Sequence, residues 1–191
     1  MKKEYEKMVI VTAPSGSGKT SITRHLMKIF PQLAFSISAT TRKPRLNEKD
    51  GADYYFITPE EFQQKILKNE FVEWEMVYEG KYYGTLKSEL KRIWKNSQIP
   101  LLDIDVQGAI HVQNEYPINS LFIFIQPPSI EELKKRLLSR GSETLESLEA
   151  RINKSSYELS FKNHFKNVVV NSKLQTACAE AESIVRSFIN K

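Results

Sequence analysis

The feature that most constrains this chain is an apolar run that leads directly into a glycine-rich turn and then a helical pattern. Residues 8–11 are continuously apolar, and the chain next passes through Pro14 and two glycines. A short apolar run that ends in turn residues is typical of a strand buried on both faces of a parallel sheet. Apolar residues recur at helical spacing over residues 22–30, and Pro31 ends the pattern. The sequence therefore predicts a strand, a tight loop and a helix, in that order.

The tight loop has the composition of a phosphate-binding loop. Residues 13–20 are Ala-Pro-Ser-Gly-Ser-Gly-Lys-Thr. Glycines allow successive backbone N–H groups to face phosphate oxygens, and the following helix N-terminus adds its positive end. In such a loop Lys19 reaches the β- and γ-phosphates, and the Thr20 hydroxyl ligates Mg²⁺. The alternative is an ordinary glycine-rich turn. Ala13 replaces the usual first glycine of the motif, which is tolerable where its φ angle is negative.

Further apolar runs indicate an α/β fold. Residues 99–104, 121–125 and 168–170 predict buried strands, and helical patterns separate them. A capping box at residues 129–132 opens one helix, and residues 174–189 are amphipathic enough to form the last one. Alternation of strands and helices implies a parallel sheet with right-handed crossovers.

Residues 36–96 break that alternation. The segments 53–57, 71–74 and 81–84 are short, aromatic and half-polar, which is typical of exposed antiparallel strands. Thr58 and Pro59 begin a helix among them. The sequence therefore predicts a small α+β insertion in a parallel-sheet core.

Two features of the insertion suit a nucleoside monophosphate. Arg42 and Arg45, stiffened by a proline, together with Tyr54 could cradle one terminal phosphate, although a solvated charged loop explains them as well. Glu73 lies between apolar neighbours and needs a partner if it is buried. Guanine offers two parallel N–H donors to one carboxylate, whereas adenine presents an acceptor at N1. An exposed strand residue with its side chain in water is the alternative for Glu73.

Composition narrows the class of protein. The chain has 191 residues, 40% of them hydrophobic and 27% charged, which predicts one globular domain and excludes a disordered chain or a membrane bundle. A net charge of +5 suits an anionic partner without identifying it. The single cysteine, Cys178, cannot form an internal disulfide, and no Cys/His cluster has zinc-ligand spacing, so a cytoplasmic location is expected. The first apolar run is too short for a signal peptide or a membrane span.

In this order, the segments resemble the guanylate kinase family, which transfers the γ-phosphate of ATP to GMP. The resemblance runs from about residue 9 to residue 185 and is carried by seven segments: 13–20, Ser38 with 41–45, 51–56, 71–74, 82–85, 102–108 and 136–141. It implies a P-loop NTPase-type parallel sheet flanked by helices. The implied segments are a core of residues 1–35, 97–135 and 152–191, a GMP-binding insertion of residues 36–96 and a helical lid of residues 136–151.

The resemblance also implies roles for individual residues. It implies that the GMP phosphate is held by Arg42, Arg45, Tyr54 and Tyr83. It implies that guanine is read by Ser38, Glu73, Thr85 and Asp105. The implied ATP contacts are Ala13, Pro14, Ser15, Gly16, Ser17, Gly18, Lys19, Thr20, Ser21 and Asn171. Asp103 ends an apolar strand and is expected to orient Mg²⁺ through water, with strand-end solvation of Asp103 and Asp105 as the alternative.

Three arginines are expected in the lid. Arg136 and Arg140 are four residues apart beside Gly141, and a second helical pattern that includes Arg151 follows a short break. Two helices joined at a glycine can close over ATP, and the resemblance assigns catalysis to Lys19 and these arginines. An exposed helix with ordinary Glu/Arg pairs is the alternative.

The partners implied are ATP and GMP, with Mg²⁺ as cofactor, and neither a nucleic acid nor a membrane is expected, while a homodimer is left open. Two other functions remain as alternatives. One is a non-catalytic module of this fold that binds phosphopeptides, which the presence of Lys19 and Thr20 disfavours. The other is a kinase of the same fold for another small phosphate compound, in which Glu73 and Thr85 would lack an obvious role.

Overall fold

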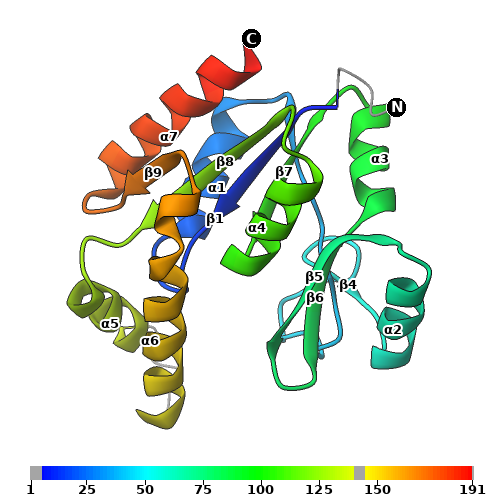
Figure 1. Cartoon of the computed structure of the whole chain (residues 1–191), viewed down its shortest axis with the longest axis horizontal. Coiled ribbons are helices and arrows are strands. Elements are labelled where there is room, and N and C mark those ends of the chain that lie inside the picture. The colour runs from blue at the N-terminus through cyan, green and yellow to red at the C-terminus, as the bar shows by residue number, and fades with distance from the viewer. Residues whose placement is uncertain (1–5, 140–144, 191) are drawn as a thin grey trace.

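The computed structural model describes residues 6–139 and 145–190, which form two β-sheets with helices around them (Figure 1). The larger sheet has five strands in the order β2-β7-β1-β8-β9, and every pairing is parallel. In that order the strands are Leu33–Phe35, Ile99–Ile104, Met8–Thr12, Ser120–Gln126 and Asn167–Val170. The predicted α/β fold with a parallel sheet is confirmed.

Strand β1 lies at the centre of the sheet and is buried on both faces. Val9 and Val11 face one layer of helices, α1 (Lys19–Ile29) and α7 (Leu174–Ile189). Met8 and Ile10 face the other layer, which contains α3 (Lys87–Lys95) and α4 (Val106–Glu115). Because both sets of alternate side chains pack against helices, the strand has to be continuously apolar. This burial fixes the loop after β1 at the edge where the parallel strands end.

The insertion forms a separate sheet of four strands in the order β4-β3-β6-β5. These strands are Tyr55–Phe56, Ala39–Thr40, Lys81–Leu86 and Phe71–Tyr78. Helix α2 (Pro59–Leu67) follows Thr58 as predicted, in a capping box: the Thr58 hydroxyl accepts from the Glu61 N–H, and the Glu61 carboxylate accepts from the Thr58 N–H. Its Phe62 stacks on Phe71 and closes a small apolar core between helix and sheet.

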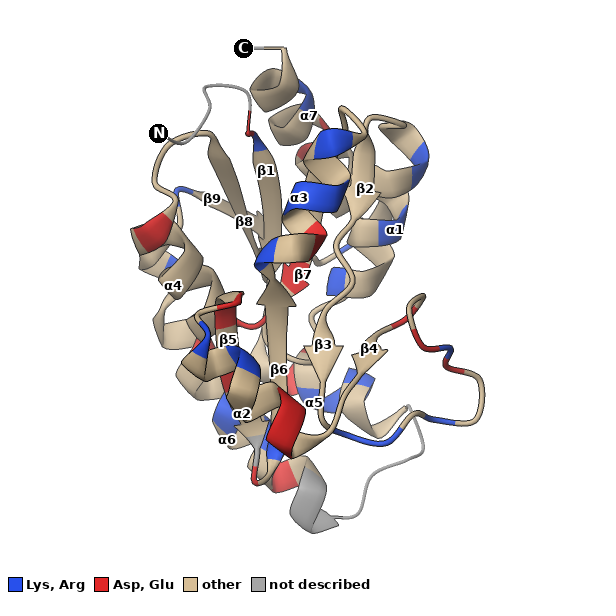
Figure 2. Ribbon diagram, turned by 90° about the vertical axis from the view of Figure 1, so that its right-hand side faces the viewer, with Lys and Arg blue, Asp and Glu red and all other residues tan. Residues whose placement is uncertain are grey.

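The expectation of purely antiparallel pairing in the insertion is wrong for one pair. Strands β5 and β3 pair with β6 in antiparallel fashion, but β3 and β4 are parallel. Residues 41–54 do not make a hairpin; they return the chain so that β4 runs in the same direction as β3. Figure 2 shows this long connection projecting beside the sheet, with basic and acidic residues along it.

Helices α5 (Ile130–Leu138) and α6 (Leu145–Ser160) pack against each other through Leu133, Leu137 and Leu148. In Figure 1 they lie at the same end of the molecule as the insertion. Helix α6 runs unbroken through residue 151, where the lid is predicted to end, and a 3₁₀ turn (Lys162–His164) follows it. Within residues 6–139 and 145–190, no helix is both long and apolar enough to cross a membrane.

Candidate active site

The loop after β1 lines a cavity of about 310 Å³, the loop cavity. Gly16 and Gly18 have φ angles of 89° and 93°, a region that favours glycine, and Gly18 lies directly before the first turn of α1. Ala13 is not among the described non-glycine residues with positive φ, so its methyl group is accommodated. The predicted ATP and catalytic residues that line this cavity are Ala13, Pro14, Ser15, Gly16, Gly18, Lys19, Thr20, Ser21 and Arg151.

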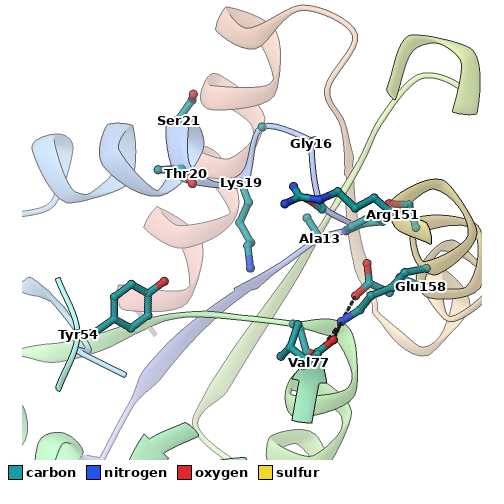
Figure 3. Close-up of a pocket in the computed structure, with 15 residues that line it drawn as sticks. Ala13, Gly16, Lys19, Thr20, Ser21, Tyr54, Val77, Arg151 and Glu158 are labelled. Atoms are coloured by element: carbon teal, nitrogen blue, oxygen red, sulfur yellow. Dashed lines mark hydrogen bonds and ion pairs between the residues drawn. The ribbon is translucent and has the colours of Figure 1, made fainter. Parts of the chain in front are cut away.

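Figure 3 shows Arg151 extending from α6 toward the side of the loop cavity where Lys19 lies. The Lys19 ammonium group is 2.6 Å from Asp103 Oδ1 and donates to the Ile104 carbonyl oxygen at 2.8 Å. Burial alone would lower the pKa of Lys19, but the Asp103 carboxylate outweighs it, so that the pKa is raised and the group is cationic at neutral pH. With Lys154, which also lines it, the cavity therefore offers three cations and a set of backbone N–H groups to an anion.

Oxygen donors at the same place suit Mg²⁺. The Thr20 hydroxyl lies in the first turn of α1, and Asp103 lies near the end of β7. Among the residues that the structure describes, no group of three or more His, Cys, Asp or Glu side chains is arranged to hold a metal. A few hard oxygen donors fit Mg²⁺ that arrives with a nucleotide and keeps phosphate and water ligands.

Of the described residues that were predicted to bind ATP or to act in catalysis, Ser17, Asn171 and Arg136 do not line the loop cavity. Ser17 is fully buried within the loop. Asn171, only 4% exposed, lies behind the loop, where its side-chain amide donates to the Ser17 carbonyl oxygen at 2.8 Å. Its backbone carbonyl accepts from Arg136 at 3.1 Å, and Arg136 also pairs with Glu132. The structure thus joins Asn171 to the loop and to α5, and Arg140 falls outside the described residues.

A second cavity, of about 190 Å³, lies between the two sheets, and we call it the Glu73 cavity. It shares Lys19, Tyr54, Val77 and Asp105 with the loop cavity, so the two adjoin. The predicted GMP and metal residues that line it are Ser38, Tyr54, Glu73, Tyr83, Asp103 and Asp105. Thr85 is nearly fully buried behind it.

Glu73 is a buried carboxyl group with a hydroxyl partner. Its Oε1 accepts from Thr85 Oγ1 at 2.6 Å, across the β5–β6 pair. Burial raises the pKa of Glu73 to about 7, although the Thr85 hydrogen bond opposes the shift. A side chain at Gly108 would lie 2.6 Å from Glu73 Oε2, so only glycine fits opposite the carboxylate. The alternative in which Glu73 is exposed to water is therefore excluded.

The Arg42 side chain forms hydrogen bonds with other residues of the insertion. Its guanidinium group donates to both Glu48 oxygens, at 2.6 and 2.7 Å, and to the Tyr83 hydroxyl at 3.2 Å. It also stacks 4.8 Å from the centre of the Tyr54 ring. The hydrogen bonds from Arg42 lower the pKa of Glu48 to about 2. Three of the predicted phosphate residues are thus in mutual contact, whereas Arg45 is exposed and its backbone N–H donates to Glu48.

Several residues near the site were not predicted from the sequence. Glu89, 2% exposed, pairs with Arg92 and accepts from the Tyr55 hydroxyl and from the backbone N–H of Ile37, which precedes Ser38. On α6, further residues lining the loop cavity are Lys154, Ser155 and Glu158. Their spacing of three, four and seven residues from Arg151 places them on one helix face, which is the signal that could have found them. No local sequence pattern indicates Glu89.

Comparisons with known proteins agree with this geometry. The family model described as guanylate kinase matches residues 5–188. The chain is 46% identical to a guanylate kinase of Bacteroides fragilis, over 96% of this chain and 90% of that protein. It is 44% identical to one of Porphyromonas gingivalis, over 97% of this chain and 99% of that protein.

Solved structures give the same result. The crystal structure of guanylate kinase from Anaplasma phagocytophilum superposes with a TM-score of 0.76 at 29% identity, over 95% of this chain and 85% of that one. A gluconokinase from Sinorhizobium meliloti 1021, with a TM-score of 0.52 and 14% identity, is similar in fold alone. With its parallel sheet, its glycine-rich loop after β1 and a family match over nearly its whole length, this chain belongs to the guanylate kinase family.

Proposed function

We propose that this guanylate kinase binds ATP with its phosphates in the loop cavity and GMP with its base in the Glu73 cavity, and transfers the γ-phosphoryl group directly. The observation that carries the proposal is the junction of the two cavities at Lys19, Tyr54, Val77 and Asp105. Two substrates bound in adjoining cavities can place donor and acceptor phosphates in line without an enzyme-bound intermediate.

Guanine recognition rests on the carboxylates. Ionised Glu73 can accept both guanine N1–H and N2–H, while Thr85 occupies part of its Oε1. Asp105 lines the same cavity, and its Oδ1 accepts from the Gly108 N–H at 2.8 Å. Adenine would place its N1 acceptor against the carboxylate of Glu73, which is also an acceptor. AMP is therefore disfavoured, because its binding would leave a buried carboxylate without a donor.

Phosphate handling rests on the cations. Arg42, Arg45, Tyr54 and Tyr83 are the proposed ligands of the GMP phosphate, which is largely dianionic at pH 7 because the second pKa of a phosphomonoester is near 6. Its oxygen needs no general base in order to attack. Lys19, Arg151 and the two other lid arginines are proposed to offset the charge that spreads over the transferring group.

The Mg²⁺ ion that accompanies ATP would lie near Thr20 and Asp103, and when bound it neutralises phosphate charge. A second role is proposed for Asp103, because its Oδ1 lies 2.6 Å from the Lys19 ammonium group. In this role Asp103 positions Lys19, which lines both cavities.

An acceptor panel tests the proposal. ADP production from ATP should be measured with GMP, AMP, UMP and dTMP as separate acceptors. GMP should give a kcat/KM at least about a hundredfold above the others, because a buried carboxylate pair left unmatched costs roughly 3 kcal/mol or more. Faster use of AMP or dTMP than of GMP would contradict guanine recognition by Glu73.

A further inference from the structure

Lys154 lies where the two cavities meet and has no part in the mechanism above. Its Nζ is 3.9 Å from Asp105 Oδ2 and 3.8 Å from Glu158 Oε1, and it donates to the Val77 carbonyl oxygen at 3.5 Å. The dashed lines in Figure 3 mark its contacts with Val77 and Glu158. One side chain from α6 thus reaches the loop after β7, its own helix and strand β5 of the insertion.

Asp105 is held from two directions. Its Oδ1 caps α4 by accepting from the Gly108 N–H at 2.8 Å, and its Oδ2 faces Lys154. A side chain in a binding site keeps its orientation when neighbouring groups hold each of its polar atoms. Without Lys154, Asp105 would keep only the first of these two contacts, the hydrogen bond from the Gly108 N–H to its Oδ1.

The surroundings of Lys154 are acidic. Burial raises the pKa of Glu158 to about 7 and also raises that of Glu75, and Lys154 opposes both shifts. Lys19 is a less suitable counter-charge for Asp105 because Asp103 and the Ile104 carbonyl already hold it. A cation at position 154 therefore offsets the repulsion among carboxylates that face the two cavities.

We propose that Lys154 is a positioning residue for GMP, which holds the Asp105 carboxylate toward the Glu73 cavity from helix α6. The inference rests on the proposed function, because it takes the Glu73 cavity as the guanine site. Lys154 acts through Asp105, so its removal should weaken GMP binding and leave ATP binding nearly unchanged. Direct contact of Lys154 with ATP phosphates is the competing role, since the residue also lines the loop cavity.

Lys154→Met separates these two roles, because methionine keeps most of the side-chain length and removes the charge. Calorimetric titration with GMP alone should show a dissociation constant about tenfold higher than that of the wild type, and KM for GMP should rise in parallel. KM for ATP should stay within about twofold. Lys154→Arg should restore most of the GMP affinity. A loss confined to ATP, or an unchanged GMP dissociation constant, would overturn the proposal.

Lys162→Met is the matched control, since it removes the same charge from an exposed lysine of the adjoining 3₁₀ turn. Thermal unfolding checks that the variants fold, and Lys154→Gln replaces Lys154→Met if the latter does not. A double-mutant cycle then tests the route of the effect. In an Asp105→Asn background, Lys154→Met should change GMP affinity less than twofold, whereas a full tenfold effect there would contradict action through Asp105.

The acceptor panel on the unmodified enzyme keeps the two claims distinct. If that enzyme does not prefer GMP, the proposed function fails. If it prefers GMP and Lys154→Met still binds GMP normally, only the inference about Lys154 fails.

Discussion

Glu73 is a buried acidic residue with one hydrogen-bond partner. The residue is 4% exposed, and Thr85 supplies the hydrogen bond that a buried polar group needs. Because burial raises its pKa to about 7, the group is partly protonated in the ligand-free protein near neutral pH. Guanine donors favour the ionised form, so substrate binding and ionisation of Glu73 are coupled.

Glu73→Gln should reduce kcat/KM for GMP by roughly 30- to 1000-fold, which is about 2–4 kcal/mol, because an amide presents an N–H donor to the guanine donors. KM for ATP should remain within about twofold. Steady-state kinetics with each substrate varied gives both values. Glu79→Gln, at an exposed position of the same hairpin, is the control. An unchanged kcat/KM for GMP would remove Glu73 from the base site.

The same variant tests the raised pKa. Between about pH 4.5 and pH 7 the folded chain binds a proton at Glu73 that the unfolded chain does not. The contribution of Glu73 to the free energy of unfolding is therefore greatest below pH 4.5 and is lost as the pH rises through 7. The free energy of unfolding should fall by roughly 2–3 kcal/mol more in the wild type than in Glu73→Gln on going from about pH 5 to about pH 8. Urea unfolding at both values measures this, and an equal pH dependence in the two proteins would refute the raised pKa.

Asn171→Ala addresses the contact behind the phosphate loop. Loss of the hydrogen bond to Ser17 should raise KM for ATP by roughly 3- to 10-fold, since one buried hydrogen bond contributes about 1 kcal/mol. If Asn171 acts by holding the loop, KM for GTP as donor should rise by the same factor. A rise for ATP alone would instead indicate that Asn171 contacts the adenine base of ATP. Asn167→Ala, which removes a hydrogen bond from β9 to the Phe122 carbonyl oxygen of β8, is the control.

At the scale of the element, α6 lines the loop cavity and, through Lys154, contacts Asp105 and Val77, which line both cavities. It begins beside α5, where Leu148 packs on Leu133, and its next turns carry the side chains that line the loop cavity. A rigid helix that bears Arg151 and Lys154 one turn apart would move both cations together if the proposed lid closes. On this proposal, lid closure and acceptor positioning are parts of one motion.

Arg151→Ala should lower kcat by about a hundredfold or more while GMP affinity changes little, because the arginine is expected to act mainly on the transferring phosphoryl group. Arg140→Ala should behave in the same way, although Arg140 lies outside the described residues. The measurement is kcat at saturating ATP and GMP, with Arg186→Ala on the exposed side of α7 as the control. A kcat within about twofold of the wild type would return Arg151 to a surface role.

Elements with a strong local pattern were predictable from the sequence. The run of residues 99–104 and the long amphipathic segment 174–189 match β7 and α7 at both ends. Strands β2 and β3 were missed because they have only three and two residues. A helix between the strands 99–104 and 121–125 was expected, but its bounds were not, since α4 starts directly after Asp105 and contains Gly108, a poor helix former.

The parts of the site also differ in how far they can be predicted from the sequence. The phosphate loop is contiguous in the sequence, so its composition indicates its chemistry. The contact of Lys154 with Asp105 joins residues far apart in the chain and depends on how α6 packs. Residues 87–95 were assigned to the insertion without a helix, yet they form α3, whose Leu90 packs with Met8 and Leu102 of the parallel sheet, a contact that only tertiary packing decides.

At the scale of the whole molecule, two sheets face a common space. Tyr54 lines the loop cavity, the Glu73 cavity and a third cavity of about 500 Å³ beside α1. The space between the sheets is therefore divided around one tyrosine that stacks on Arg42. This arrangement favours simultaneous binding of both substrates, with transfer taking place between them.

Initial rates of ADP formation, with ATP and GMP both varied, test this claim most directly. Direct transfer requires both substrates on the enzyme at once, so double-reciprocal plots at several fixed GMP concentrations should intersect. Parallel lines are the signature of a covalent enzyme intermediate formed before GMP binds. Intersecting lines are the predicted result, and parallel lines would contradict transfer between two adjoining cavities.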